Sequence, residues 1–415
     1  MTGVRGRGFF KKMPVGRAIK IIAANIRPLP FEDIGIANAS GRVLAREVTA
    51  DMDVPPFDRS AMDGYAVKGE NTFGAGQSNP IYFRVIGESL SGSTFEGEVG
   101  EFEAFRIMTG GELPKGTDAV VMLEYTNKRR GGGKKGIDVI KAVPPGKNVV
   151  LRGEDIKRGD PIFKKAHVLT PHDVGICAAA GINKITVGKR PKVGIISTGD
   201  ELTRPGAKLI AGQVYDINSY ELFSLVKSAF GAPEMLGIIK DDYEQLKGEI
   251  KKAIKFDLVI LSGATSVGEK DIIPQIVDEL GKLLFHGVSM RPGGPTGIGI
   301  IKDRPIFMLP GHPAASIFGF EVFVRTALQK MQGSTPFNPY PPAEGILLKK
   351  IASEIGRRDF IWASINNKGE IEPIKTTSSG IITGISRANG FFVVPENTEG
   401  IEKGKKVTVS LFRNL

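Results

Sequence analysis

The fold is decided by the stretch Asp257-Leu-Val-Ile-Leu-Ser-Gly-Ala-Thr-Ser-Val-Gly-Glu-Lys-Asp271. Its apolar run, residues 258–261, is typical of a strand that is buried on both faces of a parallel sheet. Ser262, Gly263 and Ser266 then form a small polar loop whose backbone amides can face an anion, and a helix is predicted after it. Strand, loop and helix in this order build ligand crevices in open α/β sheets, although an ordinary turn explains a single loop equally well.

The same alternation continues on both sides of this stretch. Predicted strands at 193–197, 235–239, 258–261 and 283–290 alternate with predicted helices at 218–230, 241–255 and 313–330. Asn218 or Ser219 is expected to cap the first of these helices. This order predicts a doubly wound, mostly parallel α/β sheet that is covered by helices on both faces.

The rest of the chain predicts smaller β domains. Residues 81–150 alternate short β-type runs with Gly and Pro turns, as a separate small β domain would. Residues 336–415 begin with a proline-rich linker and continue with short strands at regular spacing, which favours a small β-barrel-like domain. A helix is predicted between them, with Thr170 as its N-cap and Pro171 at its first position. A length of 415 residues suggests two to four domains.

Composition limits the classes of partner. Lys and Arg number 56 against 45 Asp and Glu, giving a net charge of +11, which suits an anionic small substrate. The basic residues are dispersed and only 7% of residues are aromatic, so we expect no nucleic-acid partner. Cys177 is the only cysteine, which excludes a disulfide within the chain and a cysteine-based metal site. No apolar run approaches the roughly 18 residues that span a membrane, so we expect a soluble, cytoplasmic protein.

Five loops with special composition are predicted on one rim of the α/β sheet, at 197–202, 241–242, 262–271, 291–295 and 309–313. Carboxylates stand beside the small residues of these loops, at positions Asp200, Glu201, Asp241 and Asp271. Such carboxylates can hold Mg²⁺ against a phosphate while loop amides hold the phosphate itself. Asp241 and Asp271 could equally be helix N-caps. Their convergence on one rim favours a site for a phosphorylated ligand with Mg²⁺.

An ordered set of motifs across nearly the whole chain resembles the molybdopterin molybdenumtransferases, which are related to the E domain of gephyrin. The set comprises Ser60-Ala-Met-Asp-Gly-Tyr-Ala66, Thr109-Gly, Pro114-Lys-Gly-Thr-Asp-Ala-Val-Val121, Gly153-Glu-Asp-Ile156, Ser197-Thr-Gly-Asp-Glu-Leu202, Ser262-Gly with Ser266-Val-Gly268, and Leu309-Pro-Gly-His-Pro313. Each motif is weak alone, but the ordered set is highly specific.

The resemblance implies a reaction and an architecture. Molybdate is inserted into the dithiolene of adenylylated molybdopterin, and AMP is released by Mg²⁺-dependent hydrolysis. The protein would be an elongated homodimer with its site between subunits. The implied domains are a discontinuous elongated N-terminal domain (1–54 and 151–188), a small β domain (55–150), a molybdopterin-binding α/β domain (189–332) and a C-terminal β-barrel domain (336–415).

The resemblance also assigns residues. It implies catalytic roles for Asp63, Asp241, Asp271 and Arg291, and Mg²⁺ ligands at Glu201, Asp241 and Asp271. The implied substrate-binding residues are Thr109, Asp155, Ser197, Gly199, Ser262, Gly263, Ser266, Arg357 and Ser379. Arg357 and Ser379 match positions thought to receive the oxyanion, and a guanidinium beside a hydroxyl suits a tetrahedral dianion.

The chain departs from the family pattern where the oxyanion would bind. The family's Lys-Pro-Gly-Lys-Pro is Arg291-Pro-Gly-Gly-Pro295 here, so the second cation is missing at Gly294. His312 replaces an asparagine, and Ala315 stands where a serine is expected. These departures are compatible with altered anion choice, such as tungstate, or with an inactive paralogue.

Two other functions stay open at this point. The α/β domain alone also resembles molybdopterin adenylyltransferase, although the additional domains argue against that activity. A non-catalytic scaffold is the second alternative, but it gives no reason for carboxylates at Asp63, Glu201, Asp241 and Asp271 together.

Overall fold

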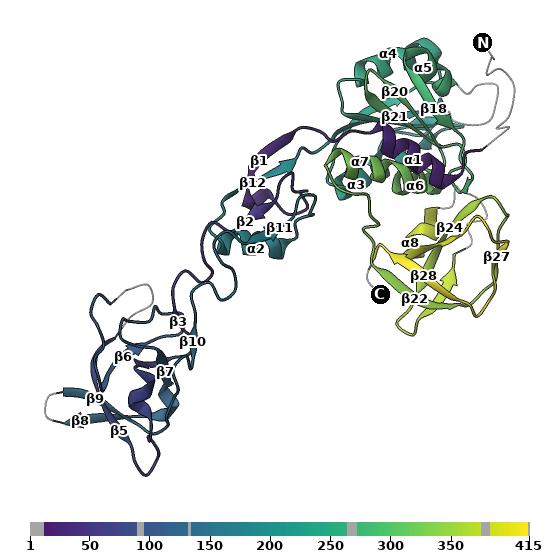
Figure 1. The fold of residues 1–415 in the computed structure, drawn as a ribbon. Helices are drawn as coiled ribbons and strands as arrows, with labels where there is room; N and C mark the ends of the chain where they lie inside the picture. The colour runs from purple at the N-terminus through teal and green to yellow at the C-terminus, as the bar shows by residue number, and fades with distance from the viewer. Residues whose placement is uncertain (1–11, 89–94, 132–133, 264–271, 375–381, 414–415) are drawn as a thin grey trace. The chain divides into compact units, whose positions relative to one another are not determined.

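The computed structural model describes residues 12–88, 95–131, 134–263, 272–374 and 382–413. The chain divides into two compact units, of which unit 1 comprises 1–32, 41–45 and 186–415 and unit 2 comprises 33–40 and 46–185 (Figure 1). Two of the boundaries between the units lie within β1 (Phe31–Gly35) and β12 (Lys184–Gly188), which pair with each other. The predicted division into four domains remains a prediction.

Unit 1 contains the predicted α/β sheet, with strand order β16-β13-β17-β21-β20-β18. Its strands are β13 (Lys192–Thr198), β16 (Ala232–Ile239), β17 (Leu258–Ser262), β18 (Lys282–His286), β20 (Gly297–Ile301) and β21 (Arg304–Leu309). The first four in spatial order are parallel, whereas β20 is antiparallel to both of its neighbours. The predicted mostly parallel sheet is confirmed.

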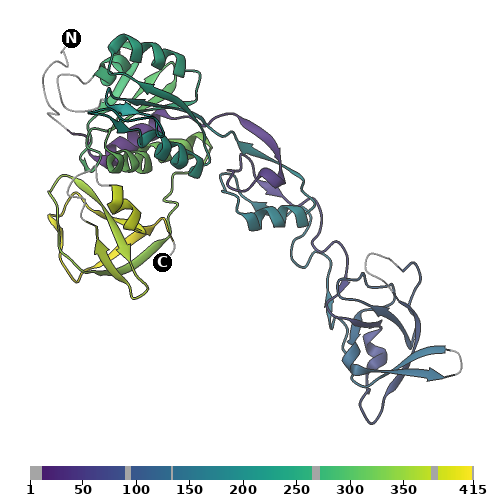
Figure 2. The same cartoon turned by 180° about the vertical axis from the view of Figure 1, so that it is seen from behind.

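Helices cover both faces of this sheet, as Figures 1 and 2 show. One face carries α1 (Val15–Asn25), α3 (Asn218–Ser228), α6 (Pro313–Gly319) and α7 (Arg325–Met331), and the other carries α4 (Tyr243–Ala253) and α5 (Ile272–Leu280). Neighbouring residues of β13 divide between the two cores, because Ile195 packs with the first group of helices and Ile196 with the second. This explains why the central strands are apolar along their whole length.

The end of unit 1 is a closed β-barrel, as predicted. Strands β24, β25, β22, β28 and β26 pair in this order, and β26 pairs again with β24. The bounds are β22 (Pro342–Leu347), β24 (Arg358–Ile365), β25 (Glu370–Pro373), β26 (Gly390–Val394) and β28 (Lys406–Leu411), with the short pair β23 (Ile351–Ala352) and β27 (Gly400–Ile401) and helix α8 (Ile382–Arg387). Phe318 of α6 shares one hydrophobic core with Phe360 and Trp362 of the barrel.

The prediction of one strand over 283–290 was wrong. The chain leaves β18 at Gly287, whose φ of 95° interrupts the extended run, and then forms β19 (Met290–Arg291). This short strand joins the barrel rather than the α/β sheet, because it pairs in parallel with β24. The register places Arg291 opposite Asp359.

Unit 2 contains a six-stranded sheet of order β7-β4-β6-β5-β9-β8. Its strands are β4 (Gly64–Val67), β5 (Ile81–Glu88), β6 (Glu103–Ile107), β7 (Ala119–Met122), β8 (Thr126–Gly131) and β9 (Lys134–Val139). The remaining elements are β2 (Val48–Thr49) paired with β11 (Pro161–Phe163), β3 (Arg59–Ser60) paired with β10 (Val149–Val150), and α2 (Pro171–Ala179). Thr170 caps α2 in a capping box with Asp173, which confirms the predicted helix start. Within the described ranges, no helix is long and apolar enough to cross a membrane.

Candidate active site in two adjoining cavities

The first cavity of unit 1, here called the acidic cavity, has a volume of about 640 Å³. It lies at the carboxyl ends of β13 and β17, where open α/β sheets bind their ligands. Its wall includes three carboxylates and three residues of the predicted loops, namely Glu201, Asp216, Asp241, Gly199, Ser262 and Gly263. The fold thus gathers residues from the loops after several different strands onto one rim, as the parallel order requires.

Gly263 is needed where the loops meet. Its φ is 114°, and a Cβ at this position would lie only 2.0 Å from the backbone oxygen of Thr198. Its amide donates a hydrogen bond to the Leu309 carbonyl at 3.2 Å. A glycine therefore lets the ends of β13, β17 and β21 approach one another closely and form a continuous wall.

Asp241 is held in the wall without serving as a helix cap. Its Oδ1 accepts a hydrogen bond from the Thr198 hydroxyl at 2.5 Å. The N-cap of α4 is the next residue, Asp242, whose Oδ1 accepts from the Gln245 amide at 2.8 Å. The capping interpretation of Asp241 is therefore wrong, and its exposed carboxylate faces the acidic cavity.

Asp216 was missed by the sequence analysis. Its buried carboxylate accepts hydrogen bonds from the Ser197 hydroxyl at 3.0 Å and from the Ser219 amide at 3.1 Å. Asp216 therefore accepts a hydrogen bond from one of the free backbone amides at the start of α3. The predicted cap by Asn218 or Ser219 was wrong. Ser197 is fully buried in this network, where it positions the wall. No signal in the sequence separated Asp216 from an ordinary loop aspartate.

Asn218 was also missed, since it was interpreted as a cap. Its Nδ2 donates to the Ser262 hydroxyl at 2.7 Å and to the Gly311 carbonyl at 2.8 Å. Its side chain thus ties α3 to the loops that follow β17 and β21. The Oδ1 is buried without a hydrogen-bond partner among the described residues, in a side chain that lines the acidic cavity.

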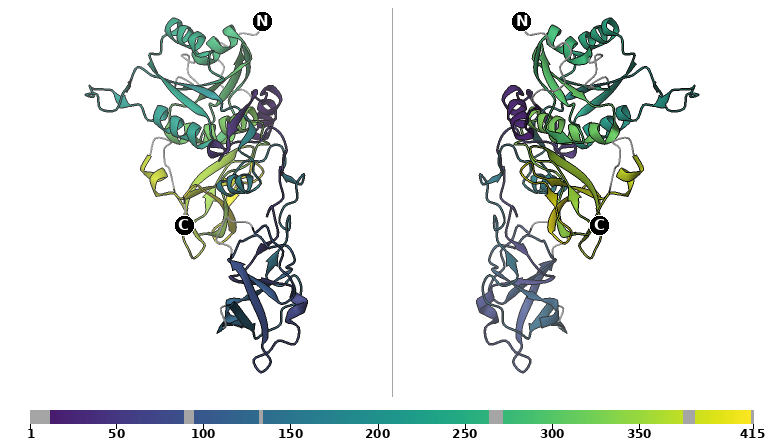
Figure 3. Two further views of the ribbon diagram at one scale, coloured as in Figure 1. Left: turned by 90° about the vertical axis from the view of Figure 1, so that its left-hand side faces the viewer. Right: turned by 90° about the vertical axis from the view of Figure 1, so that its right-hand side faces the viewer.

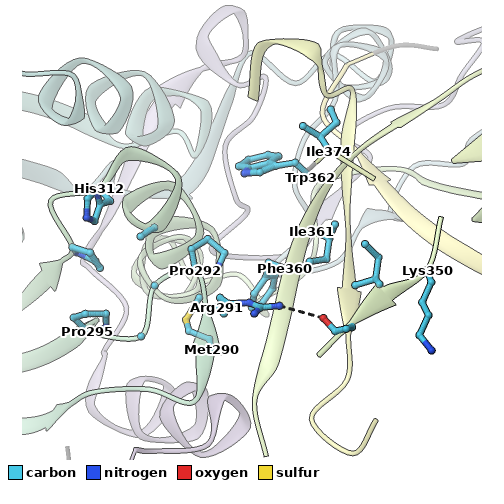
Figure 4. A pocket seen from close by; sticks show the side chains of 16 residues that line it. Met290, Arg291, Pro292, Pro295, His312, Lys350, Phe360, Ile361, Trp362 and Ile374 are labelled. Carbon is cyan, nitrogen blue, oxygen red and sulfur yellow. Dashed lines mark hydrogen bonds between the residues drawn. The ribbon is translucent and has the colours of Figure 1, made fainter. Parts of the chain in front are cut away.

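The second cavity, here called the basic cavity, has a volume of about 810 Å³ and is shown in Figure 4. It lies between loop 291–295 of the α/β domain and β24 of the barrel. Arg291, His312 and Lys350 line it, and none of the described lining residues is acidic. A cavity lined in this way favours an anionic ligand.

Asp359 gathers the two arginines that were predicted to receive the oxyanion. It is fully buried, and Arg291 and Arg357 both form ion pairs with it. Arg357 donates from Nε to Asp359 Oδ1 at 2.8 Å, and Arg291 also reaches the Ala352 carbonyl at 3.4 Å. The pairing of β19 with β24 creates this cluster, because it places Arg291 in register with Asp359. No local pattern around Asp359 indicated that this carboxylate would lie between the two cations.

The two cavities share part of their walls. Pro295, Pro310 and His312 line both, so a ligand that fills one cavity can reach the other. Gly294 lies in the same loop without a left-handed φ, and a Cβ there would meet no atom closer than the Met290 carbonyl oxygen at 3.5 Å. The backbone therefore does not require glycine at 294, and the missing side chain leaves space in the basic cavity.

Asp63 and Thr109 are neighbours in unit 2. Asp63 Oδ1 accepts from the Thr109 amide and from the Thr109 hydroxyl, both at 2.7 Å. These hydrogen bonds, the backbone one most strongly, lower the pKa of the Asp63 carboxyl, so it is ionised at neutral pH. Asp155 is exposed in the same unit, and its amide donates to the Val54 carbonyl at 3.1 Å.

Three predicted residues, Ser266, Asp271 and Ser379, lie outside the described residues. Within the described part of the chain, no group of three or more His, Cys, Asp or Glu residues is placed to hold a metal ion. Magnesium commonly uses only one or two carboxylates and completes its shell with water and substrate phosphate. Glu201 and Asp241, which line one cavity, fit that donor set.

Comparisons with known proteins agree with this architecture. The description "MoeA N-terminal region (domain I and II)" matches residues 13–181, "Probable molybdopterin binding domain" matches 194–330, and "MoeA C-terminal region (domain IV)" matches 344–412. Fold and cavities thus define a multidomain α/β enzyme of the molybdopterin-binding class. The chain belongs to the MoeA family, the molybdopterin molybdenumtransferases of molybdenum cofactor biosynthesis.

Individual relatives extend along nearly the full chain. A molybdopterin molybdenumtransferase of Bacillus subtilis is 34% identical, with 97% of this chain and 94% of the relative covered. Its counterpart in Haemophilus influenzae is 31% identical, over 94% of this chain and 97% of the relative. The crystal structure of a molybdopterin biosynthesis MoeA protein from Pyrococcus horikoshii superposes with a TM-score of 0.83 at 35% identity, covering 97% of this chain and 100% of that one.

Proposed function

We propose that the chain inserts molybdenum or tungsten, supplied as the oxyanion, into the dithiolene of adenylylated molybdopterin and releases AMP with the help of Mg²⁺. The observation that carries this proposal is the pair of adjoining cavities with opposite charge. An adenylylated pterin phosphate needs carboxylates for Mg²⁺ at one end of the site. A tetrahedral dianion needs cations at the other, and His312 lies on the wall that joins the two.

The acidic cavity would hold the nucleotide and the pterin phosphate. Glu201 and Asp241, together with Asp271, would hold Mg²⁺, which withdraws charge from the phosphate that is attacked by water. Gly199 and Gly263 line this cavity without side chains, so the phosphate could approach the backbone of both loops closely. Ser262 and Ser266 add hydroxyl groups to the same loop.

The basic cavity would hold the oxyanion. Arg291 lines this cavity and is ion-paired with the buried Asp359, which also pairs with Arg357. Arg357 pairs in addition with the exposed Glu354, so the charges of these four side chains balance. The guanidinium of Arg291 would donate charge-assisted hydrogen bonds to the dianion, as would Arg357 if it reaches the ligand, and Ser379 would add a hydroxyl donor. Molybdate and tungstate have the same shape and charge, so we propose both as substrates.

We propose that the protein acts as a homodimer in the cytoplasm. Support for a dimer comes from an arm between β14 (Leu202–Thr203) and β15 (Val214–Tyr215), which projects from unit 1 in teal in Figure 3. Large apolar side chains are exposed on this arm and beside it, at Leu209, Ile210, Val214, Tyr215 and Tyr220. Exposed apolar clusters of this kind are typical of protein interfaces. Asp63, Thr109 and Asp155 would complete the acidic cavity of the partner subunit.

The test is a reconstitution with purified components. The protein is mixed with adenylylated molybdopterin, Mg²⁺ and either molybdate or tungstate, and the formation of AMP and of metal cofactor is followed. We expect both products with at least one oxyanion. The absence of both products with both oxyanions would refute the proposal. Pyrophosphate release from ATP and molybdopterin would instead indicate the adenylyltransferase activity.

A further inference from the structure

Trp362 of β24 contains a buried hydrogen-bond donor that the described structure leaves without a partner. Its side chain is 5% exposed, and its Nε1 has no hydrogen-bond acceptor among the described residues. An indole N–H that has lost its contact with water normally finds an acceptor within the protein. The missing acceptor therefore requires an explanation.

Aromatic neighbours fix the orientation of this indole. The ring centroid of Phe318 lies 4.4 Å from that of Trp362, and the ring of Phe412 lies 5.5 Å away at an interplanar angle of 89°. Packing of this kind leaves the ring little freedom to rotate in search of another acceptor. Trp362 also lines the basic cavity, and Figure 4 shows its nitrogen edge turned toward the loop that carries His312.

The charge of the cavity indicates what the acceptor is. Arg291, His312 and Lys350 line it together with Trp362, whereas no carboxylate does so among its described lining residues. Arg291 is ion-paired with Asp359 and Lys350 with Glu402, and neither of these carboxylates lines the cavity. Among the described residues, the charged and polar side chains that face the cavity therefore offer N–H donors and no carboxylate acceptor. A ligand that satisfies them all has several acceptor oxygens and a negative charge.

We propose that Trp362 is a binding residue for the oxyanion, and that its Nε1–H donates a hydrogen bond to one oxygen of the bound molybdate or tungstate. This inference rests on the proposed function and adds a specific neutral donor to it. Arginine side chains attract the dianion, while a rigid indole fixes the position of one oxygen without adding charge. The oxygen acceptor in turn satisfies the donor that is buried in the ligand-free protein.

The chain offers a direct optical test, because Trp362 is its only tryptophan. Fluorescence excited at the indole band therefore reports on this residue alone. We expect a saturable change in emission when molybdate or tungstate is added to the wild-type protein, and none with sodium chloride at equal ionic strength. Calorimetric binding of the anion without any change in emission would overturn the inference.

Trp362→Phe supplies the second test, because phenylalanine keeps an aromatic ring in the cluster and removes only the N–H donor. By calorimetry we expect about tenfold weaker oxyanion binding, the usual effect of losing one hydrogen bond to a charged group. In turnover assays the KM for the oxyanion should rise while kcat is retained. Phe412→Leu is the matched control, since it alters the same cluster but keeps the donor, and its affinity should stay close to that of the wild type.

The outcomes separate this inference from the proposed function. Wild-type turnover with unchanged oxyanion affinity in Trp362→Phe would refute only the role of Trp362. Equal weakening in Trp362→Phe and Phe412→Leu would show that packing matters rather than the donor, which also refutes that role. Absence of both oxyanion binding and turnover in the wild type would refute the proposed function and the inference with it.

Discussion

Asp241 and Asp242 are adjacent carboxylates that the fold assigns to different tasks. Asp242 caps α4, whereas Asp241 faces the acidic cavity and accepts a hydrogen bond from the Thr198 hydroxyl. We predict that Asp241→Asn lowers the rate of AMP release at least about tenfold, because a neutral amide is a poor Mg²⁺ ligand. Raising the Mg²⁺ concentration should restore part of the loss.

Asp242→Asn is the control for this prediction. Asparagine caps helices about as well as aspartate does, so this variant should keep wild-type turnover and stability. Equal activity of Asp241→Asn and Asp242→Asn in the AMP-release assay would show that Asp241 does not bind the metal.

Gly293 and Gly294 give a second comparison at the scale of single residues. We predict that Gly294→Lys binds molybdate several-fold more tightly, because it adds a cation to the basic cavity at a position where a Cβ meets no atom closer than 3.5 Å. Gly293→Lys should instead destabilise the protein, since this glycine has a φ of 107° and a Cβ would lie 2.8 Å from Met290 Cε. Calorimetric titration with molybdate and thermal unfolding measure the two effects. Weaker molybdate binding by Gly294→Lys would contradict the prediction.

Some single residues could be assigned from the sequence and others could not. Glu201, Asp241 and Gly263 stand in loops whose composition is unusual by itself, and the structure places them on one cavity. Asp216 and Asn218 line the same cavity, but their roles depend on hydrogen bonds to residues that only the tertiary fold brings near. Local patterns favour capping for such residues, because capping is visible within four positions of the chain.

Helix α3 illustrates a prediction at the scale of an element. Burial raises the pKa of the Glu221 carboxyl to about 7, and its Oε2 has no hydrogen-bond partner in the described part of the chain. Because the folded state holds this proton more tightly than the unfolded chain does, stability falls as the pH rises from the ordinary glutamate range to about 7. Above about pH 7 Glu221 is ionised in the folded protein, and the buried negative charge lowers the free energy of unfolding by its full amount.

We therefore predict that Glu221→Gln raises the melting temperature at pH 8 by roughly 2 °C or more and leaves it nearly unchanged at pH 4. Glutamine has the same size and cannot ionise. Thermal unfolding of both proteins at pH 4, 6 and 8 measures the difference. Lys227→Gln, on an exposed position of the same helix, is the control and should show no such pH dependence.

Helices and strands whose apolar residues recur with a clear period could be predicted from the sequence. Short strands that are defined only by their pairing with another strand could not. The apolar strand β17 and the helices around it follow from the pattern of residues 192–331 alone. The break of the predicted strand at Gly287 and the transfer of β19 to the barrel do not, because a two-residue strand is recognised only by its pairing with β24. The position of Arg291 depends on that pairing.

The arm between β14 and β15 gives a prediction for the whole molecule. Ile210 on this arm is 66% exposed, and Ile355 before β24 is 67% exposed. If the arm forms the dimer interface, Ile210→Glu should convert the dimer into a monomer, because a buried unpaired charge is costly there. Ile355→Glu changes an equally exposed isoleucine and should leave the dimer intact. Sedimentation equilibrium distinguishes these results, and a dimer in both variants would exclude the arm from the interface.

A site between subunits can be tested by complementation. Asp63→Asn and Asp241→Asn subunits, coexpressed with different tags and purified as the mixed dimer, should regain about half of wild-type activity. One of the two sites then combines an intact Asp63 with the intact Asp241 of the partner. Each variant alone should keep only the low activity that its own substitution leaves.

The reciprocal mixture makes the test decisive. This second dimer combines one wild-type subunit with one subunit that carries both Asp63→Asn and Asp241→Asn. It therefore has the same two substitutions as the first mixture, but both are on one subunit. A site shared between subunits is then damaged in both copies, so this dimer should be inactive. A site within one chain predicts the opposite result for both mixtures. The wild-type subunit of the second dimer would keep its own intact site and be active, whereas the two single variants of the first dimer could not rescue each other. The ratio of AMP release from the two mixed dimers therefore decides whether unit 2 serves its own unit 1 or that of its partner.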